Sequence, residues 1–173
     1  MIRTVKSIKV YENPFVDVYD DAVEFGDGSE GRYFYSRWKA PHGVVALIER
    51  AGEVLLIRSY RYSEGCYAWE LPQGFGTHGS EPAADCRREV LEETGLVIAR
   101  IEPLYQFGSR FVTHAFHCHV PTTSDADATG REASESIAGF RWISREEASL
   151  PGLANLGVID PVSAALLLAW ANT

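Results

Sequence analysis

The chain has 173 residues, of which 46% are hydrophobic, and a formal net charge of −8. That length suits one domain with a full core and a small extension. The acidic balance argues against a nucleic-acid partner, because nucleic-acid binding draws on clustered Lys and Arg. It does not exclude a small phosphorylated ligand, because a bound metal ion inverts the local charge.

The cysteines and the apolar runs bear on the cellular compartment. Cys66, Cys86 and Cys118 are odd in number and show no C-x-x-C pairing, which favours reduced thiols over a disulfide framework. No apolar run approaches the ~20 residues of a transmembrane helix. Residues 1–13 also lack the apolar core of a signal peptide. We therefore expect a cytoplasmic protein with no membrane partner.

Residues 1–40 are predicted to form a β-rich section. Short apolar and polar stretches alternate here, and residues 16–19 and 33–38 have the composition of strands. Gly26 and Gly28 mark a hairpin turn between them. We expect this section to precede a main domain over residues 41–173.

The main domain alternates strands and helices. Residues 44–49 and 53–60 predict two strands around a turn at Ala51-Gly52, and their continuous apolar runs indicate burial on both faces. Later elements are expected as strands at 96–107, 110–120 and 137–143, a helix from about 81 to 94, a short helix opened by a capping box at 144–147, and a C-terminal helix after Asp160-Pro161. This order predicts a mixed sheet with helices on its faces, an α/β fold.

Three carboxylates crowd one face of the helix predicted at 81–94. Glu89, Glu92 and Glu93 lie within about 100° of arc, beside the apolar stripe that should face the core. Like charges so close are unfavourable unless a cation lies among them. Mg²⁺ and Mn²⁺ prefer oxygen ligands of this kind, so the sequence predicts a divalent-cation site.

These residues belong to a longer pattern. The Nudix hydrolases carry the box G-x5-E-x7-R-E-U-x-E-E-x-G-U, where U is bulky and apolar, and this chain resembles it at Gly74, Arg88, Glu89, Val90, Glu92, Glu93, Gly95 and Leu96. One position departs, because Ser80 stands where the box has Glu, with Glu81 beside it. The resemblance implies that the box glutamate at this position pairs with the arginine or supports the metal cluster. The preceding W-E-L-P-Q-G at 69–74 is similar to the lead-in of the ADP-ribose pyrophosphatase group. The resemblance implies a Nudix-type α/β/α sandwich with a mixed sheet, plus the small N-terminal β section.

The resemblance also implies roles for individual residues. Glu89, Glu92, Glu93 and the backbone carbonyl of Gln73 would be metal ligands for Mg²⁺ or Mn²⁺, and Arg88 would orient the glutamates. Arg88, Glu92 and Glu93 are therefore expected to be catalytic. The general base would be a glutamate of a later loop, where Glu135 is favoured over Glu132 because it lies nearer the following strand. Glu92 is the alternative base, and Glu132 and Glu135 could also be ordinary solvated acids.

Substrate contacts and assembly rest on weaker patterns. Arg58 and Arg61 end a predicted strand, and guanidinium groups suit phosphate recognition; the alternative is that they are surface charges. Gly74 is expected to let the substrate approach the loop. Tyr33, Phe34, Tyr35 and Trp38 cluster in the section that builds a homodimer in ADP-ribose pyrophosphatases. They could instead cover a sheet edge.

The function that the resemblance implies is metal-dependent hydrolysis of a nucleoside diphosphate linked to another moiety. ADP-ribose, giving AMP and ribose 5-phosphate, is the first choice. GDP- or ADP-sugars, NADH and dinucleoside polyphosphates are alternatives. A catalytically silent, nucleotide-binding Nudix module is the rival from another class. Ser80 favours that rival, since a one-residue shift to Glu81 turns the side chain by about 100° around the helix, whereas the intact glutamate cluster opposes it.

Overall fold

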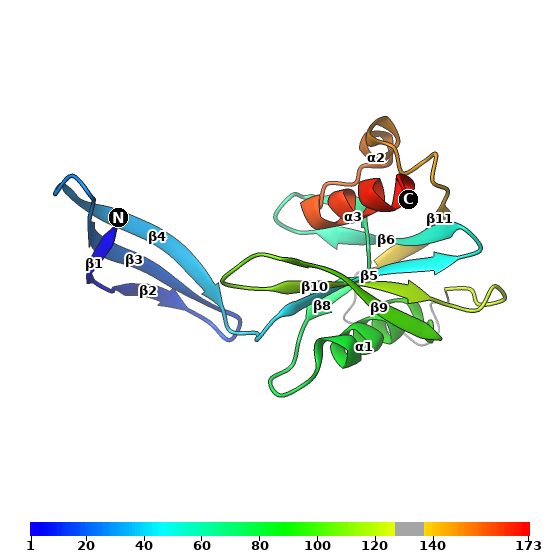
Figure 1. The fold of residues 1–173 in the computed structure, drawn as a ribbon, viewed down its shortest axis with the longest axis horizontal. Helices are drawn as coiled ribbons and strands as arrows, with labels where there is room; N and C mark the ends of the chain where they lie inside the picture. The colour runs from blue at the N-terminus through cyan, green and yellow to red at the C-terminus, as the bar shows by residue number, and fades with distance from the viewer. Residues whose placement is uncertain (127–136) are drawn as a thin grey trace.

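A computed structural model describes residues 1–126 and 137–173. Its first part is a four-stranded antiparallel sheet that projects away from the rest of the chain, in blue in Figure 1. Strand β3 pairs with β1 and β2 along one side and with β4 along the other. The strands are β1 (Arg3–Lys6), β2 (Lys9–Glu12), β3 (Val16–Glu24) and β4 (Glu30–Trp38). The hairpin expected at the paired glycines is the β3–β4 turn.

The second part is a seven-stranded sheet covered by helices on both faces. Strands β5 and β10 are parallel and the other pairs are antiparallel, so the sheet is mixed. Helix α1 lies on one face, and α2 and α3 lie on the other (Figure 1). The expected α/β/α sandwich is thereby confirmed. The elements are β5 (Gly43–Arg50), β6 (Glu53–Arg61), β7 (Cys66–Glu70), β8 (Gln73–Phe75), α1 (Pro82–Thr94), β9 (Arg100–Phe107), β10 (Thr113–His119), β11 (Ile137–Ile143), α2 (Leu150–Leu156) and α3 (Pro161–Ala171).

Strands β5 and β6 start as a hairpin and then separate. Ala51 and Gly52 both have positive φ, 51° and 84°, the geometry of a primed turn that suits the twist of paired strands. Beyond the two pairs next to this turn, β8 takes the edge of β5 and β7 takes the edge of β6. Because the two strands separate, the segment that links β7 to β8 crosses the middle of the sheet.

Each face of the sheet has its own apolar core. Leu47, Leu56 and Leu167 belong to the core under α3, whereas Ile48 and Leu55 belong to the core under α1. Successive residues of β5 and β6 alternate between the two cores because side chains alternate along a strand. This double coverage accounts for the continuous apolar runs. No helix in the described part of the chain has both the length and the apolar character to cross a bilayer.

Strand and helix boundaries differ in part from those expected. The strand expected at 96–107 begins only at Arg100, because Gly95 adopts left-handed φ of 72° and the Leu96 amide donates to the Thr94 hydroxyl at 3.2 Å. The strand expected at 110–120 is shortened to Thr113–His119. Helix α1 begins one residue late, with Glu81 as its N-cap.

The prediction of a helix that begins at the capping box, residues 144–147, is wrong. The Ser144 amide donates to the Glu147 carboxylate at 3.0 Å, and the Glu147 amide approaches the Ser144 hydroxyl at 3.4 Å, so the reciprocal pair is present. Only a turn follows, because Pro151 has no N–H to continue a helix from residue 147. Helix α2 starts instead after Ser149, whose side chain caps it.

A buried carboxylate stabilises the N-terminal sheet. Asp21 is only 5% exposed and accepts hydrogen bonds from the Ile8 amide at 2.9 Å, the Ser7 hydroxyl at 2.9 Å and the Tyr35 hydroxyl at 3.3 Å. The Ile8 amide is the main cause that lowers the pKa of Asp21 below its ordinary value, against the opposing effect of burial. The ionised form is therefore the form that stabilises the fold.

We predict that acid weakens this sheet through Asp21. Stabilisation from a carboxyl with a lowered pKa is complete above the ordinary Asp value of about 3.9 and is lost as the pH falls through the folded-state pKa. The melting temperature should therefore fall more between pH 5 and pH 3 for the wild type than for Asp21→Asn, as followed by circular dichroism. Equal declines in both proteins would contradict the assignment.

Candidate active site

The segment between β7 and β8 is built into the sheet. Leu71 is fully buried and its amide donates to the Ser163 hydroxyl of α3 at 3.0 Å, while the Pro72 carbonyl accepts from the Ala46 amide at 2.8 Å. These bonds tie the segment to both α3 and β5. The backbone of Gln73 and Gly74 is thereby held between the sheet and α1.

Glu70, at the end of β7, is buried beside Arg61. The carboxylate is 1% exposed and lies 2.5 and 2.8 Å from two guanidinium nitrogens of Arg61. Burial raises the pKa of Glu70, and the Arg61 charge opposes that rise. Arg61 is therefore committed to Glu70, and its side chain is still 42% exposed. Arg58 is exposed and lies 5.1 Å from the Tyr67 ring centroid. The structure places both arginines on β6, on the part of that strand that pairs with β7.

Helix α1 orients its glutamates through an ordinary helix start and stop. Pro82 opens the helix, and Gly95 ends it with its amide donating to the Leu91 carbonyl at 2.9 Å. Cys86 and Val90, both buried, face the sheet. Glu89 and Glu93, four residues apart, follow at the margin of this buried stripe and are 9% and 6% exposed.

Two of the three glutamates touch the backbone of β8. Gly74 has no side chain, and a Cβ there would overlap the Glu89 carboxylate, so only glycine allows this approach. The Gln73 amide donates to Glu93 at 3.0 Å. Because N–H and C=O of one residue leave a strand on the same side, the Gln73 carbonyl also points away from β5. The backbone of β8 and the acids of α1 thus form one surface.

Arg88 joins the glutamates to the loop. It donates to Glu92 at 2.6 Å, to Glu89 at 2.8 Å and to the Phe75 carbonyl at 2.9 Å. Burial disfavours its charge, but Glu89 and Glu92 outweigh that effect and raise the pKa of Arg88 above its ordinary value. Arg88 therefore offsets the negative charge of Glu89 and Glu92, and it also fixes the backbone at Phe75.

The donor set fits a hard divalent cation. Glu89, Glu92, Glu93 and the Gln73 carbonyl offer only oxygen, which Mg²⁺ and Mn²⁺ prefer. In residues 1–126 and 137–173, no three His, Cys, Asp or Glu side chains converge as a ready ligand group. The contacts explain this, because Arg88 draws Glu89 and Glu92 toward itself and the Gln73 amide engages Glu93.

Asp85 and His42 belong to this site, and the sequence did not point to them. Asp85 is 2% exposed; one of its carboxylate oxygens accepts from the Thr77 amide at 3.2 Å and lies 3.0 Å from His42 Nε2. Burial disfavours its charge, yet the Thr77 amide, His42 and the Ser80 hydroxyl together lower the pKa of Asp85. An acid in the first turn of a helix is common because of the helix dipole, so its spacing gave no signal.

Glu132 and Glu135, the loop candidates for the general base, lie outside the described residues. The choice between Glu135 and Glu92 therefore stays a prediction. Among described residues, the site comprises the acidic face of α1, the backbone of β8 and the loop between them.

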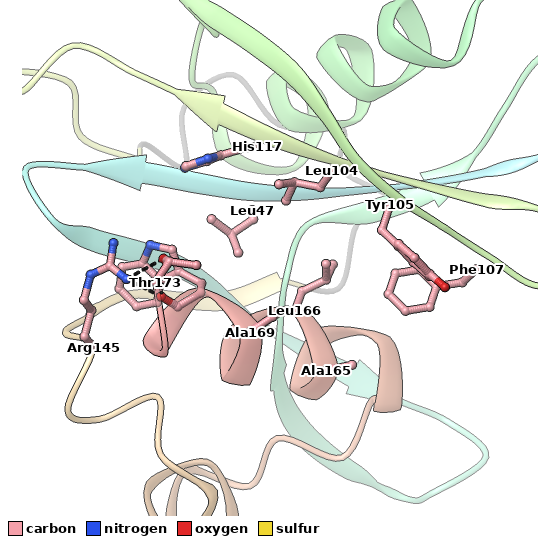
Figure 2. Close-up of a pocket in the computed structure, with 11 residues that line it drawn as sticks. Leu47, Leu104, Tyr105, Phe107, His117, Arg145, Ala165, Leu166, Ala169 and Thr173 are labelled. Carbon is pink, nitrogen blue, oxygen red and sulfur yellow. Dashed lines mark hydrogen bonds between the residues drawn. The ribbon is translucent and has the colours of Figure 1, made fainter.

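A separate cavity of about 430 Å³ lies on the other face of the sheet, between α3 and strands β9 and β10 (Figure 2). Leu47, Leu166 and Phe107 contribute to its mostly apolar wall. At one end, Arg145 donates to the Trp170 carbonyl and to the Thr173 hydroxyl, the dashed lines of Figure 2. None of the residues lining this cavity carries a predicted site role.

The chain is an α/β/α sandwich in which the acidic helix α1 packs against the backbone of Gly74 in β8. Residues 39–162, well over half of the chain, match the NUDIX domain. The chain therefore belongs to the Nudix family and is a Nudix pyrophosphohydrolase. Members of this family generally use divalent metals.

Several known proteins are similar to this chain. A CMP-5'-(N-acetyl-N-hydroxy-3-aminopropyl)phosphonate hydrolase from Streptomyces rubellomurinus is 25% identical over 143 residues, 81% of this chain and 68% of that protein. A methanol dehydrogenase activator from Bacillus methanolicus is 25% identical over 80% of this chain and 71% of its own length. An RNA pyrophosphohydrolase from Bartonella bacilliformis is 37% identical over 57 residues, 30% of this chain and 34% of that protein. The crystal structure of an ADP compounds hydrolase shares the fold, with a TM-score of 0.70, 18% identity, and coverage of 97% of this chain and 92% of that one.

We predict that Gly74→Ala disrupts the site. The added methyl overlaps the Glu89 carboxylate, so the side chain must move, at a cost of about 1–3 kcal/mol in the free energy of unfolding. Hydrolysis should fall by about 100-fold, because Glu89, a predicted metal ligand, is displaced. Chemical denaturation and a turnover assay measure the two effects.

Gly139→Ala is the matched control. A Cβ at this glycine of β11 would meet Trp69 at an ordinary 3.9 Å. The control should retain activity, and full activity of Gly74→Ala would contradict the close approach.

Proposed function

We propose that the chain hydrolyses ADP-ribose to AMP and ribose 5-phosphate in the presence of Mg²⁺ or Mn²⁺. The observation that carries this proposal is the convergence of Glu89 and Glu93 on the β8 backbone with Arg88 alongside. The choice of ADP-ribose is supported by the W-E-L-P-Q-G segment and by the fold shared with an ADP compounds hydrolase.

In the proposed mechanism, Glu89, Glu92, Glu93 and the Gln73 carbonyl hold the cation. When bound, the cation neutralises charge on the phosphoryl oxygens and lowers the pKa of a water. Arg88 keeps the glutamates and the Phe75 carbonyl in position. Glu135 removes the proton from the attacking water, with Glu92 as the alternative base. The bare backbone at Gly74 lets the diphosphate approach.

Arg58 and Arg61 are proposed to meet the substrate with their exposed sides. Arg58 is exposed on β6, and Arg61 keeps 42% of its side chain exposed although it is paired with Glu70. Guanidinium groups recognise phosphate oxygens in pairs, which suits a diphosphate. The pairing with Glu70 orients the Arg61 side chain for such a contact.

We expect turnover of ADP-ribose with Mg²⁺ or Mn²⁺ in a phosphatase-coupled assay. Glu93→Gln should lower the rate by about 10²–10³-fold, because the amide cannot supply the charge that holds the cation. Glu102→Gln, which changes an exposed glutamate of β9, should leave the rate unchanged. The same assay with GDP- and ADP-sugars, NADH and dinucleoside polyphosphates ranks the alternative substrates.

One result would overturn the proposal that the chain is an enzyme. No turnover of any compound in this panel, with tight nucleotide binding retained, would make the chain a silent nucleotide-binding Nudix module. The Ser80 departure motivates that rival. The hydrogen bonds of Arg88 to Glu89 and Glu92 argue against a silent module.

We also propose that residues 41–173 form the catalytic domain and that residues 1–40 mediate a homodimer. Strands β1 and β2 are exposed along their whole length, and the sheet stands apart from the main domain (Figure 1). Phe15 and Phe34 are 65% and 70% exposed. An apolar sheet surface of this kind marks an interaction site. A cytoplasmic location agrees with three free cysteines, and no nucleic-acid partner is proposed.

We predict that the wild type elutes with twice the 19.2 kDa mass of one chain in light scattering coupled to gel filtration. Phe34→Asp should shift the mass toward one chain, because a charge is costly in an apolar interface. Val97→Asp, at an apolar residue that is 72% exposed outside the N-terminal sheet, is the control and should stay dimeric. A monomeric wild type would refute the dimer.

A further inference from the structure

We propose that Asp85, held by His42, replaces the glutamate missing at position 80 as the positioning residue that fixes the active-site loop and Arg88. The inference rests on the proposed function, because it concerns the same cation site. Its starting point is the departure at Ser80 within an otherwise matching Nudix box.

Glu81 is the obvious substitute by sequence, and its position argues against that role. It is the N-cap residue of α1, it is exposed, and its side chain makes no capping hydrogen bond. A side chain directed to solvent at the start of the helix does not order the loop that precedes it. The loop therefore depends on another carboxylate.

Asp85 lies close to both the loop after β8 and Arg88. It accepts from the Thr77 amide at 3.2 Å, which ties down the loop after β8, and it also interacts with the Ser80 hydroxyl. Its second oxygen lies 3.6 Å from Arg88. Asp85 is 2% exposed, so these contacts act in a site with little competing water.

His42 holds Asp85 from the other side of the loop. Its Nε2 lies 3.0 Å from Asp85, the residue is 8% exposed, and its carbonyl accepts from the Gly76 amide at 2.8 Å. A Cβ at Gly76 would overlap the His42 ring, so the second glycine of the loop permits this packing. Gly74 therefore leaves room for the Glu89 carboxylate, and Gly76 leaves room for the His42 ring that holds Asp85.

The arrangement also gives Arg88 acceptors other than the cation ligands. If Glu89 and Glu92 turn toward a cation, the Phe75 carbonyl and Asp85 remain beside the guanidinium. Arg88 then stays in place without drawing the ligands away. This is the role that a carboxylate at position 80 would otherwise fill.

Asp85→Asn tests the inference with Mn²⁺ as the probe. Titration calorimetry on the full chain without substrate should show Mn²⁺ affinity weakened by about 10-fold, the range for residues that orient metal ligands. In the turnover assay, kcat should fall by about 10- to 100-fold while KM for ADP-ribose stays within about twofold. Ser80→Glu in the Asp85→Asn background should recover most of the affinity.

Two controls separate positioning from stability. Glu147→Gln removes another carboxylate that accepts a backbone amide, from Ser144 at 3.0 Å, and pairs an arginine, Arg141 at 2.7 Å, but outside the site. It should leave Mn²⁺ affinity unchanged. If Asp85→Asn does not fold, His42→Asn replaces it and should weaken Mn²⁺ affinity in the same direction.

The outcomes distinguish the two proposals. Wild-type Mn²⁺ affinity in a folded Asp85→Asn protein, or no recovery from Ser80→Glu, would overturn the role of Asp85. Absence of turnover in the wild type, with Mn²⁺ binding still dependent on Asp85, would overturn the hydrolase and leave the positioning role intact.

Discussion

The contact between the α1 glutamates and the β8 backbone is the constraint on which the site depends. Glu89 and Glu93 are nearly buried, and two buried carboxylates four residues apart repel each other unless charge and hydrogen bonds compensate. Arg88 supplies the charge and the Gln73 amide supplies a hydrogen bond. Gly74 allows the approach because it has no side chain. The same geometry that relieves the repulsion therefore brings together the oxygen atoms of the proposed cation site.

The contact between the α1 glutamates and β8 is possible because two strands of the sheet separate. Strands β5 and β6 separate after their turn, and the chain crosses from the edge of β6 to the edge of β5. Buried Leu71 and Pro72 hold the crossing between α3 and β5. A loop on the surface would leave Gln73 and Gly74 mobile, whereas here the sheet and both helical layers position them. The precision of the site thus comes from the core.

Substrate choice depends on parts of the molecule outside this contact. The similar proteins are named for different reactions, on a CMP-linked phosphonate, on RNA and on ADP compounds, although they share sequence or fold with this chain. A shared fold does not fix the substrate. The proposed cation site would account for hydrolysis of a phosphate anhydride, and the exposed arginines of β6 are proposed to meet the diphosphate.

Local patterns in the sequence predicted the family, the α/β class, the hairpins and the approximate span of α1, because spacing along a helix and turn glycines are local properties. The sequence also indicated which acids share a face. Only the tertiary structure revealed that Arg61 is paired with buried Glu70, that the capping box at Ser144 yields a turn, and that Asp85 meets His42. Residues 42 and 85 are far apart in the chain, and the packing of α1 against the sheet brings them together. No local pattern encodes such a contact, since it depends on how the chain folds around one core.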